Sequence, residues 1–165
     1  MSTAVSDRIE KQVLLRAPLA RVWKALTDAT EFGEWFGVDF DGPFVAGAAL
    51  SGRITPTKVD AEIAREQQPY EGMPFVIEVD RIEPLKAFSF RWNPYAIDPQ
   101  ADYRTEPMTL VEFTLEETAA GVLLKVVESG FDKVPIERRA EAFTANEGGW
   151  TSQMTLIRKY VEKTA

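Results

Sequence analysis

One apolar stripe at the C-terminal end constrains the fold more than any other feature of the chain. Within residues 135–165, a set of positions recurs at alternating steps of four and three, which places them on one face of a single long helix. These positions are Ile136, Ala140, Phe143, Glu147, Trp150, Met154, Ile157 and Val161. All of them except Glu147 are apolar, so the helix needs a broad apolar partner, and we expect a sheet to provide it.

The segments before this helix have the pattern of short helices and β-strands. Residues 9–16 are predicted to form a first strand, and Pro18 then favours the start of a helix. Residues 31–36 are typical of a second short helix, and apolar residues alternate with polar ones along successive segments of 38–129. We therefore predict an α+β fold, with a curved antiparallel sheet wrapped around the long C-terminal helix and two short helices after the first strand.

Length and composition indicate one globular unit. The chain has 165 residues, 45% of them hydrophobic and 27% charged, so we expect one domain over 1–165. No apolar run approaches the roughly 20 residues that a membrane-spanning helix needs, so we expect no membrane insertion. The polar N-terminus lacks the pattern of a signal peptide, which favours a cytoplasmic protein.

Charge and residue types exclude several kinds of chemistry. The net charge is −7 without any cluster of Lys and Arg, which argues against nucleic-acid partners. The chain contains no Cys and no His, which excludes disulfides, thiol nucleophiles, a Ser-His-Asp triad and metal sites of imidazole or thiolate ligands. We expect no metal, no cofactor and no catalytic residues, and any catalysis would depend on carboxylates, Lys, Arg, Tyr or water.

A sheet that grips a helix leaves room for a ligand cavity between them. The residues that we expect to line it are Trp35, Phe36, Phe75, Phe90, Trp92, Phe113, Phe143, Glu147, Trp150 and Met154. Plain core packing is the alternative for each aromatic residue. In an antiparallel meander the long connections 56–74 and 93–107 fall at the same end of the sheet, so we expect the mouth of the pocket there, unless these connections are simple insertions.

Glu147 and the two glycines after it are the unusual residues of the C-terminal helix. Glu147 either lies at an exposed edge, because a seven-residue repeat drifts around a helix, or points into the cavity and binds the polar end of a ligand or an Arg. Gly148 and Gly149 each destabilise a helix by about 1 kcal/mol relative to Ala. Close packing on the sheet is our expectation for them, and a kink or clearance for a ligand are the alternatives.

Four motifs resemble the activator of heat-shock protein 90 ATPase homologue-like family, within the START-like or SRPBCC superfamily that shares the birch-pollen-allergen fold. The motifs occur in the family order over nearly the whole chain. They are the segment from Ala17 to Thr27, Glu34-Trp35-Phe36-Gly37, Glu128-Ser129-Gly130-Phe131 and Asn146-Glu147-Gly148-Gly149-Trp150-Thr151. The resemblance implies the helix-grip fold: a strand, two short helices, an antiparallel sheet and a long C-terminal helix.

Three functions follow from these observations. The first is non-catalytic binding of a small hydrophobic molecule between the sheet and the C-terminal helix. The second, which the resemblance implies, is a co-chaperone or stress-related module that binds a chaperone. The third is a cyclase-like or hydrolytic enzyme that uses Glu147. No feature of the sequence indicates an oligomeric state.

Overall fold

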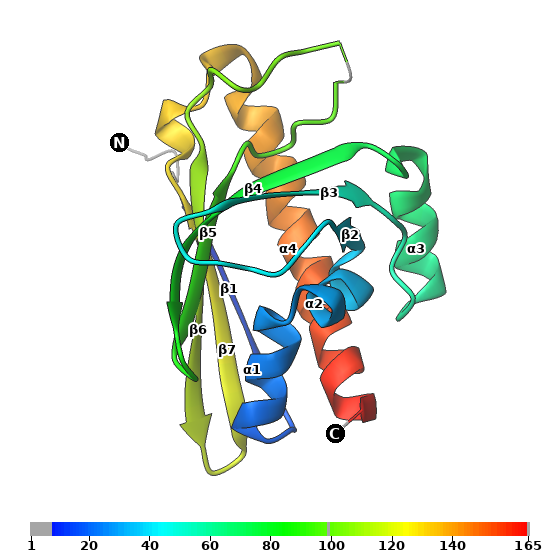
Figure 1. The fold of residues 1–165 in the computed structure, drawn as a ribbon, viewed down its shortest axis with the longest axis vertical. Coiled ribbons are helices and arrows are strands. Elements are labelled where there is room, and N and C mark those ends of the chain that lie inside the picture. The colour runs from blue at the N-terminus through cyan, green and yellow to red at the C-terminus, as the bar shows by residue number, and fades with distance from the viewer. Residues whose placement is uncertain (1–7, 99, 165) are drawn as a thin grey trace.

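The computed structural model describes residues 8–98 and 100–164, and it contains a seven-stranded antiparallel sheet in the order β1-β7-β6-β5-β4-β3-β2 (Figure 1). Strands β2 to β7 therefore form a meander, and β1 pairs with β7 at the far edge. The strands are β1 (Arg8–Leu15), β2 (Val38–Phe40), β3 (Ala49–Ile54), β4 (Pro74–Glu83), β5 (Ala87–Trp92), β6 (Thr109–Thr118) and β7 (Gly121–Ser129).

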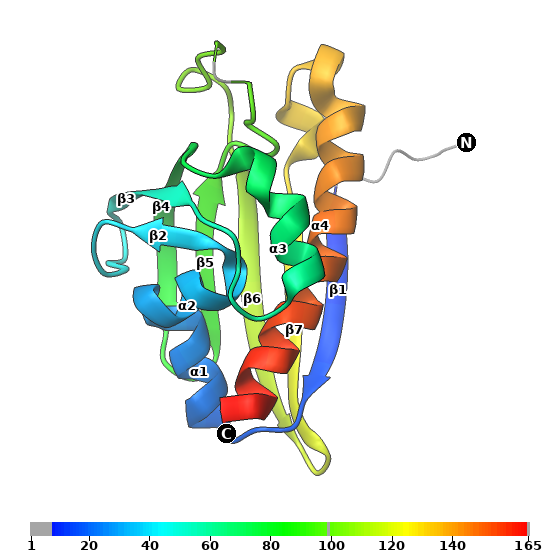
Figure 2. The same cartoon turned by 90° about the vertical axis from the view of Figure 1, so that its right-hand side faces the viewer.

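The helices lie on one face of this sheet (Figures 1 and 2). They are α1 (Leu19–Thr27), α2 (Ala29–Phe36), α3 (Ala61–Gln67) and α4 (Ile136–Thr164), with 3₁₀ turns η1 (Gln68–Tyr70) and η2 (Phe131–Lys133). The long helix α4 runs beside β1 and contacts both α1 and α2. This arrangement confirms the predicted helix-grip fold. The long connection 56–74 is not a plain loop, because it contains α3 and η1.

Local side chains explain where α2 begins and ends. The carboxylate of Asp28 accepts hydrogen bonds from the backbone N–H groups of Thr30 and Glu31, which caps the N-terminus of α2. Gly37 ends the helix with a left-handed φ of 100°. A Cβ there would lie 2.8 Å from Gln67 Oε1 and 2.9 Å from the carbonyl oxygen of Thr55, so only glycine fits this position.

The concave face of the sheet is packed with apolar side chains. In β7 every second residue points inward, and Val122, Leu124 and Val126 are each at most 1% exposed. The ring of Phe32 in α2 contacts the rings of Trp35, Phe36, Phe40, Phe44, Phe88, Phe90 and Phe113 at centroid distances of 4.8 to 6.5 Å. Aromatic rings therefore fill much of the space between the sheet and the helices.

The buried face of α4 differs from the predicted stripe in its N-terminal half. Ile136 is 72% exposed and Ala140 and Glu147 are also exposed, whereas Ala142 is fully buried. An α-helix turns about 100° per residue, so Asn146 lies about 40° from Trp150 around the axis and Glu147 about 60° on the other side. The buried face consequently passes through Asn146, and Glu147 is exposed, which agrees with the first of the two alternatives given for this residue.

Gly148 and Gly149 are exposed as well. A Cβ at either position would meet no atom within 4 Å. The expected close packing of these glycines on the sheet was therefore wrong.

A polar cluster joins α1, α2 and the last turns of α4. Glu31 accepts hydrogen bonds from Arg21 at 2.7 Å and from the hydroxyl of Tyr160 at 3.0 Å, and the Arg21 guanidinium lies 5.1 Å from the centroid of the Tyr160 ring. Burial, together with the hydrogen bond to the Glu31 carboxylate, raises the pKa of Tyr160 to about 12. These contacts fix the C-terminal half of α4 against the short helices.

Candidate functional site

A completely buried carboxylate lies between the sheet and α4. Glu128 in β7 has no exposed surface, and its two oxygens accept hydrogen bonds from four side chains. The donors are Trp92 Nε1 at 2.7 Å, Thr109 Oγ1 at 2.6 Å, Asn146 Nδ2 at 2.9 Å and Trp150 Nε1 at 2.8 Å. We call these five residues the Glu128 cluster.

The strand pattern explains why a carboxylate occupies this position. Glu128 continues the inward series of Val122, Leu124 and Val126, since alternate residues of β7 face the helices. Trp92 and Thr109 pair with each other across β5 and β6, so both arrive beside Glu128 from the neighbouring strands. From the sequence, Glu128 was noted only as part of a family motif, although the alternation along β7 indicates an interior position for it.

The electrostatics of the cluster depend on hydrogen bonds alone. Among the residues that the structure describes, no recorded ion pair includes Glu128. A buried carboxylate is strongly unfavourable unless its oxygens are satisfied, and four donors can satisfy two carboxylate oxygens. A carboxylate only accepts, so it fixes the two indole N–H groups and the Asn146 amide in single orientations.

Two residues of this cluster, Trp92 and Trp150, also pack with Phe36 and Phe75. We call these four aromatic side chains the aromatic rim. The centroid of the Trp92 ring lies 5.7 Å from that of Trp150, 5.5 Å from Phe75 and 6.1 Å from Phe36. Phe36 is 7% exposed and Trp150 2% exposed, while Trp92 and Phe75 are only partly buried. The rim therefore combines an enclosed inner side with an accessible outer edge.

The structure brings together only some of the residues expected to line a cavity. Phe36, Phe75, Trp92 and Trp150 form the rim. The deeper residues Trp35, Phe90, Phe113 and Met154 are at most 5% exposed within the core, and Phe143 packs on Phe131, with a centroid distance of 5.1 Å. Glu147 is exposed beside the buried face of α4. Asn146, which was quoted only within a family motif, is the residue of this segment that contacts Glu128.

Two hollows of the described residues lie away from α4. A groove of about 740 Å³ lies between α2 and β2, where its lining includes Glu34, Asp39 and Lys58. A smaller one, of about 380 Å³, is lined by residues of β3, β4 and β5 that include Asp80 and Arg91. The hydrogen bond from Ser89, followed by the one from Arg91, lowers the pKa of Asp80. The space between the sheet and α4 is instead occupied by the aromatic core.

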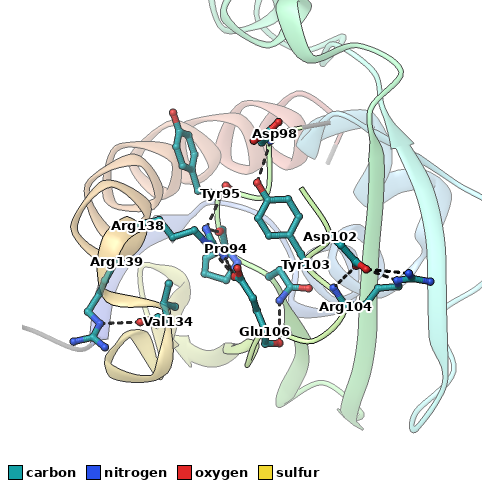
Figure 3. Close-up of polar contacts among 11 residues, drawn as sticks. Pro94, Tyr95, Asp98, Asp102, Tyr103, Arg104, Glu106, Val134, Arg138 and Arg139 are labelled. Carbon is teal, nitrogen blue, oxygen red and sulfur yellow. Dashed lines mark hydrogen bonds and ion pairs between the residues drawn. The ribbon is translucent and has the colours of Figure 1, made fainter. Parts of the chain in front are cut away.

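The connection between β5 and β6 is attached to α4 beside the cluster. Arg138 of α4 donates two hydrogen bonds to Glu106 Oε1, at 2.9 and 2.7 Å, and one to the carbonyl of Pro94 at 2.7 Å (Figure 3). Its guanidinium lies 5.0 Å from the centroid of the Tyr103 ring. This connection starts directly after Trp92, so Arg138 holds the backbone that leaves the aromatic rim.

Tyr95 in the same connection has an unusual backbone. Its φ is 52°, a left-handed value that is uncommon for residues other than glycine. Burial and, next, the charge of Glu141 raise the pKa of its phenol. Tyr95 packs against the edge of the core, so the left-handed turn places an aromatic ring close to the N-terminal half of α4.

In residues 8–98 and 100–164, no group of three or more carboxylates is arranged to hold a metal ion. No helix in that part of the chain has the length and apolar character to cross a membrane.

Comparison with known proteins identifies the family. The family described as Activator of Hsp90 ATPase homolog 1-like protein matches residues 16–162. The chain belongs to this family. The match spans all four motifs of the sequence analysis, including Glu128 and Asn146, and no curated protein matches the chain.

Solved structures similar to this member of the Activator of Hsp90 ATPase homolog 1-like family share its fold. DynU16, from the dynemicin biosynthetic locus, is 25% identical with a TM-score of 0.67 over 96% of this chain and 48% of DynU16, so the chain spans about half of that protein. Protein MLL2253 from Mesorhizobium loti is 22% identical, with a TM-score of 0.69 over 96% of this chain and 98% of that one. The protein encoded by BPP1335 from Bordetella parapertussis is 21% identical, with a TM-score of 0.67 and coverages of 98% and 78%.

Proposed function

We propose that this protein binds a small, mainly aromatic or hydrophobic molecule at the aromatic rim, without covalent chemistry. The observation that carries the proposal is the Glu128 cluster, in which a fully buried carboxylate fixes Trp92 and Trp150 through their indole N–H groups. Fixed aromatic rings with an accessible edge suit a flat apolar ligand, because little conformational freedom is lost on binding.

The surroundings of the rim support this proposal. The accessible Trp92 and Phe75 are 5.5 Å apart between centroids in an edge-to-face arrangement, and they lie beside the connection that Arg138 holds. The apolar core beneath is already filled, so the ligand occupies the rim and not a preformed interior chamber. DynU16 belongs to a biosynthetic locus, which agrees with a role for this fold in handling small molecules.

Native mass spectrometry of protein purified without detergent tests the proposal. We expect a small-molecule adduct that is lost on denaturation and is weakened in Trp92→Ala. Trp23→Ala serves as a matched control, because Trp23 lies in α1, outside the rim. An adduct that persists unchanged in Trp92→Ala and Phe75→Ala would place binding elsewhere.

A second candidate function is interaction with a chaperone. The family description and the filled interior favour it, since an interaction module needs no internal cavity. It predicts that the purified protein changes the ATPase rate of an Hsp90-type chaperone. No change in rate and no co-purification with such a chaperone would refute this candidate.

Catalysis through Glu147 is not part of the proposal. Glu147 is exposed, and it does not take part in the Glu128 cluster. Its carboxylate therefore lacks the enclosed surroundings that made a catalytic role attractive.

A further inference from the structure

We infer that Asn146 determines the specificity of the aromatic rim, and that it selects ligands which donate a hydrogen bond from a hydroxyl or N–H group on an aromatic frame. This inference rests on the proposed ligand-binding function and specifies the class of ligand. It concerns the side-chain carbonyl oxygen of Asn146, which the Glu128 cluster leaves unused.

The carboxylate of Glu128 fixes the orientation of the Asn146 amide. Asn146 Nδ2 lies 2.9 Å from Glu128 Oε1 and 3.1 Å from Oε2, and a carboxylate can only accept hydrogen bonds. The reverse orientation would place the amide oxygen against two carboxylate oxygens, so the network assigns the NH₂ group to Glu128. The oxygen Oδ1 consequently points away from the carboxylate.

This oxygen has no hydrogen-bond partner among the described residues and is not fully buried. Within residues 8–98 and 100–164, Asn146 Oδ1 accepts no hydrogen bond. Gln153 Oε1 is the one enclosed side-chain polar atom of that part of the chain that lacks a partner. Asn146 Oδ1 also lacks one but is not enclosed, so it remains open to an incoming group.

The surroundings of Asn146 decide which donors fit. Its amide shares the Glu128 carboxylate with Trp92 and Trp150, whose rings form the rim, so the amide lies beside indole surfaces on which a flat aromatic frame can pack. A carboxylate or phosphate ligand would be repelled, because it would face the acceptor oxygen Oδ1 and the nearby negative charge of Glu128. The net charge of −7 of the protein also disfavours anions. The site therefore favours neutral phenols, aromatic alcohols and aromatic N–H compounds over anions.

Gln153, the second side-chain amide of α4, cannot take the same role. Gln153 donates through Nε2 to the carbonyl of Phe36 at 3.1 Å, as does Gln67 at 3.1 Å. Its oxygen is enclosed and has no open path to a ligand. Asn146 is thus the residue of α4 that combines a fixed amide with an accessible acceptor beside the rim.

Calorimetric titration with a matched pair of probes tests the inference. The probes are 2-naphthol and 2-methoxynaphthalene, which share the same aromatic frame, but only 2-naphthol donates a hydrogen bond. We expect 2-naphthol to bind the wild-type protein about 3- to 10-fold more tightly, as one hydrogen bond allows. The anion 2-naphthoate is expected to bind more weakly than either probe.

The variant Asn146→Ala should remove the preference while retaining 2-methoxynaphthalene binding, and Glu147→Ala, its exposed neighbour, should leave the preference unchanged. Equal affinities of the two probes for the wild-type protein would overturn the inference but leave ligand binding at the rim intact. Absence of binding for both probes would overturn the proposed function and the inference together. The wild-type comparison decides the inference even if Asn146→Ala fails to fold.

Discussion

Replacing Glu128 by Gln tests the cluster at the centre of this account. The change keeps the shape of the side chain but converts one acceptor oxygen into an NH₂ donor. If the NH₂ replaces Oε1, it faces Asn146 and Trp150, and if it replaces Oε2, it faces Trp92 and Thr109. The Asn146 amide or the Thr109 hydroxyl can turn to accept, but an indole N–H cannot. In either orientation one indole N–H loses its acceptor.

The magnitude follows from these contacts. A buried donor left without an acceptor destabilises the fold by about 1–3 kcal/mol, and the remaining bonds lose the strength that an ionised acceptor provides, roughly 1 kcal/mol more. Relief from burying a charge offsets part of this loss. We expect Glu128→Gln to lower the free energy of unfolding by about 2 kcal/mol, which corresponds to a fall in Tm of about 4–8 °C for a chain of this length.

Urea unfolding followed by tryptophan fluorescence measures this loss. The matched control is Glu147→Gln, the same substitution at an exposed position of α4, which should change stability by less than about 0.5 kcal/mol. Equal stabilities of Glu128→Gln and Glu147→Gln would refute the reasoning, because the buried carboxylate would then contribute nothing through its four donors. A more stable Glu128→Gln would show that desolvation of the charge outweighs the hydrogen bonds.

Three other perturbations test further parts of the structure. Gly148→Ala and Gly149→Ala should each stabilise the protein by about 0.5–1 kcal/mol in urea unfolding, because each added methyl group meets open space on α4, and a loss of stability would show hidden packing there. Arg138→Gln should accelerate amide hydrogen exchange in residues 95–98 and 100–106, whereas Arg104→Gln, whose pair with Asp102 is exposed, should not. Equal exchange in both variants would show that Arg138 does not hold the connection. Tyr160 should ionise near pH 12 in the folded protein but near pH 10 when unfolded, so its contribution to stability is complete below pH 10 and is lost as the pH rises towards 12. An absorbance titration of Tyr160→Phe should lack the ionisation step near pH 12, and a titration curve identical to that of the wild-type protein would contradict this prediction.

The sequence predicted the architecture because alternation and helical spacing are repeated over many residues. A first strand was expected over residues 9–16 and β1 spans Arg8–Leu15, and the C-terminal helix and the two short helices were also found. Errors of one residue in a strand end do not change which side chains face the core. The prediction of fold class therefore tolerated local errors.

The site was harder to predict because single residues decide it. From Phe143, a step of three along α4 reaches Asn146 and a step of four reaches Glu147. Both steps fit a helical stripe, yet Glu147 is exposed whereas Asn146 binds Glu128. The glycines after them suggested contact with the sheet, while the structure places them in open space. The role of Glu128 depends on donors from β5, β6 and α4, and pairing between such distant segments is not encoded in any local spacing.

Spectra of the indole N–H groups test the central claim most directly. In protein labelled with ¹⁵N-tryptophan, titration with 2-naphthol should shift the indole signals of Trp92 and Trp150, which line the aromatic rim and bind Glu128. The indole signal of Trp35, which donates to the carbonyl of Ala25 in the buried core, should stay in place. Shifts of Trp92 and Trp150 alone would confirm ligand binding at the rim. A saturable shift of Trp35 or Trp23 with Trp92 and Trp150 unchanged, or no shift of any indole signal, would contradict it.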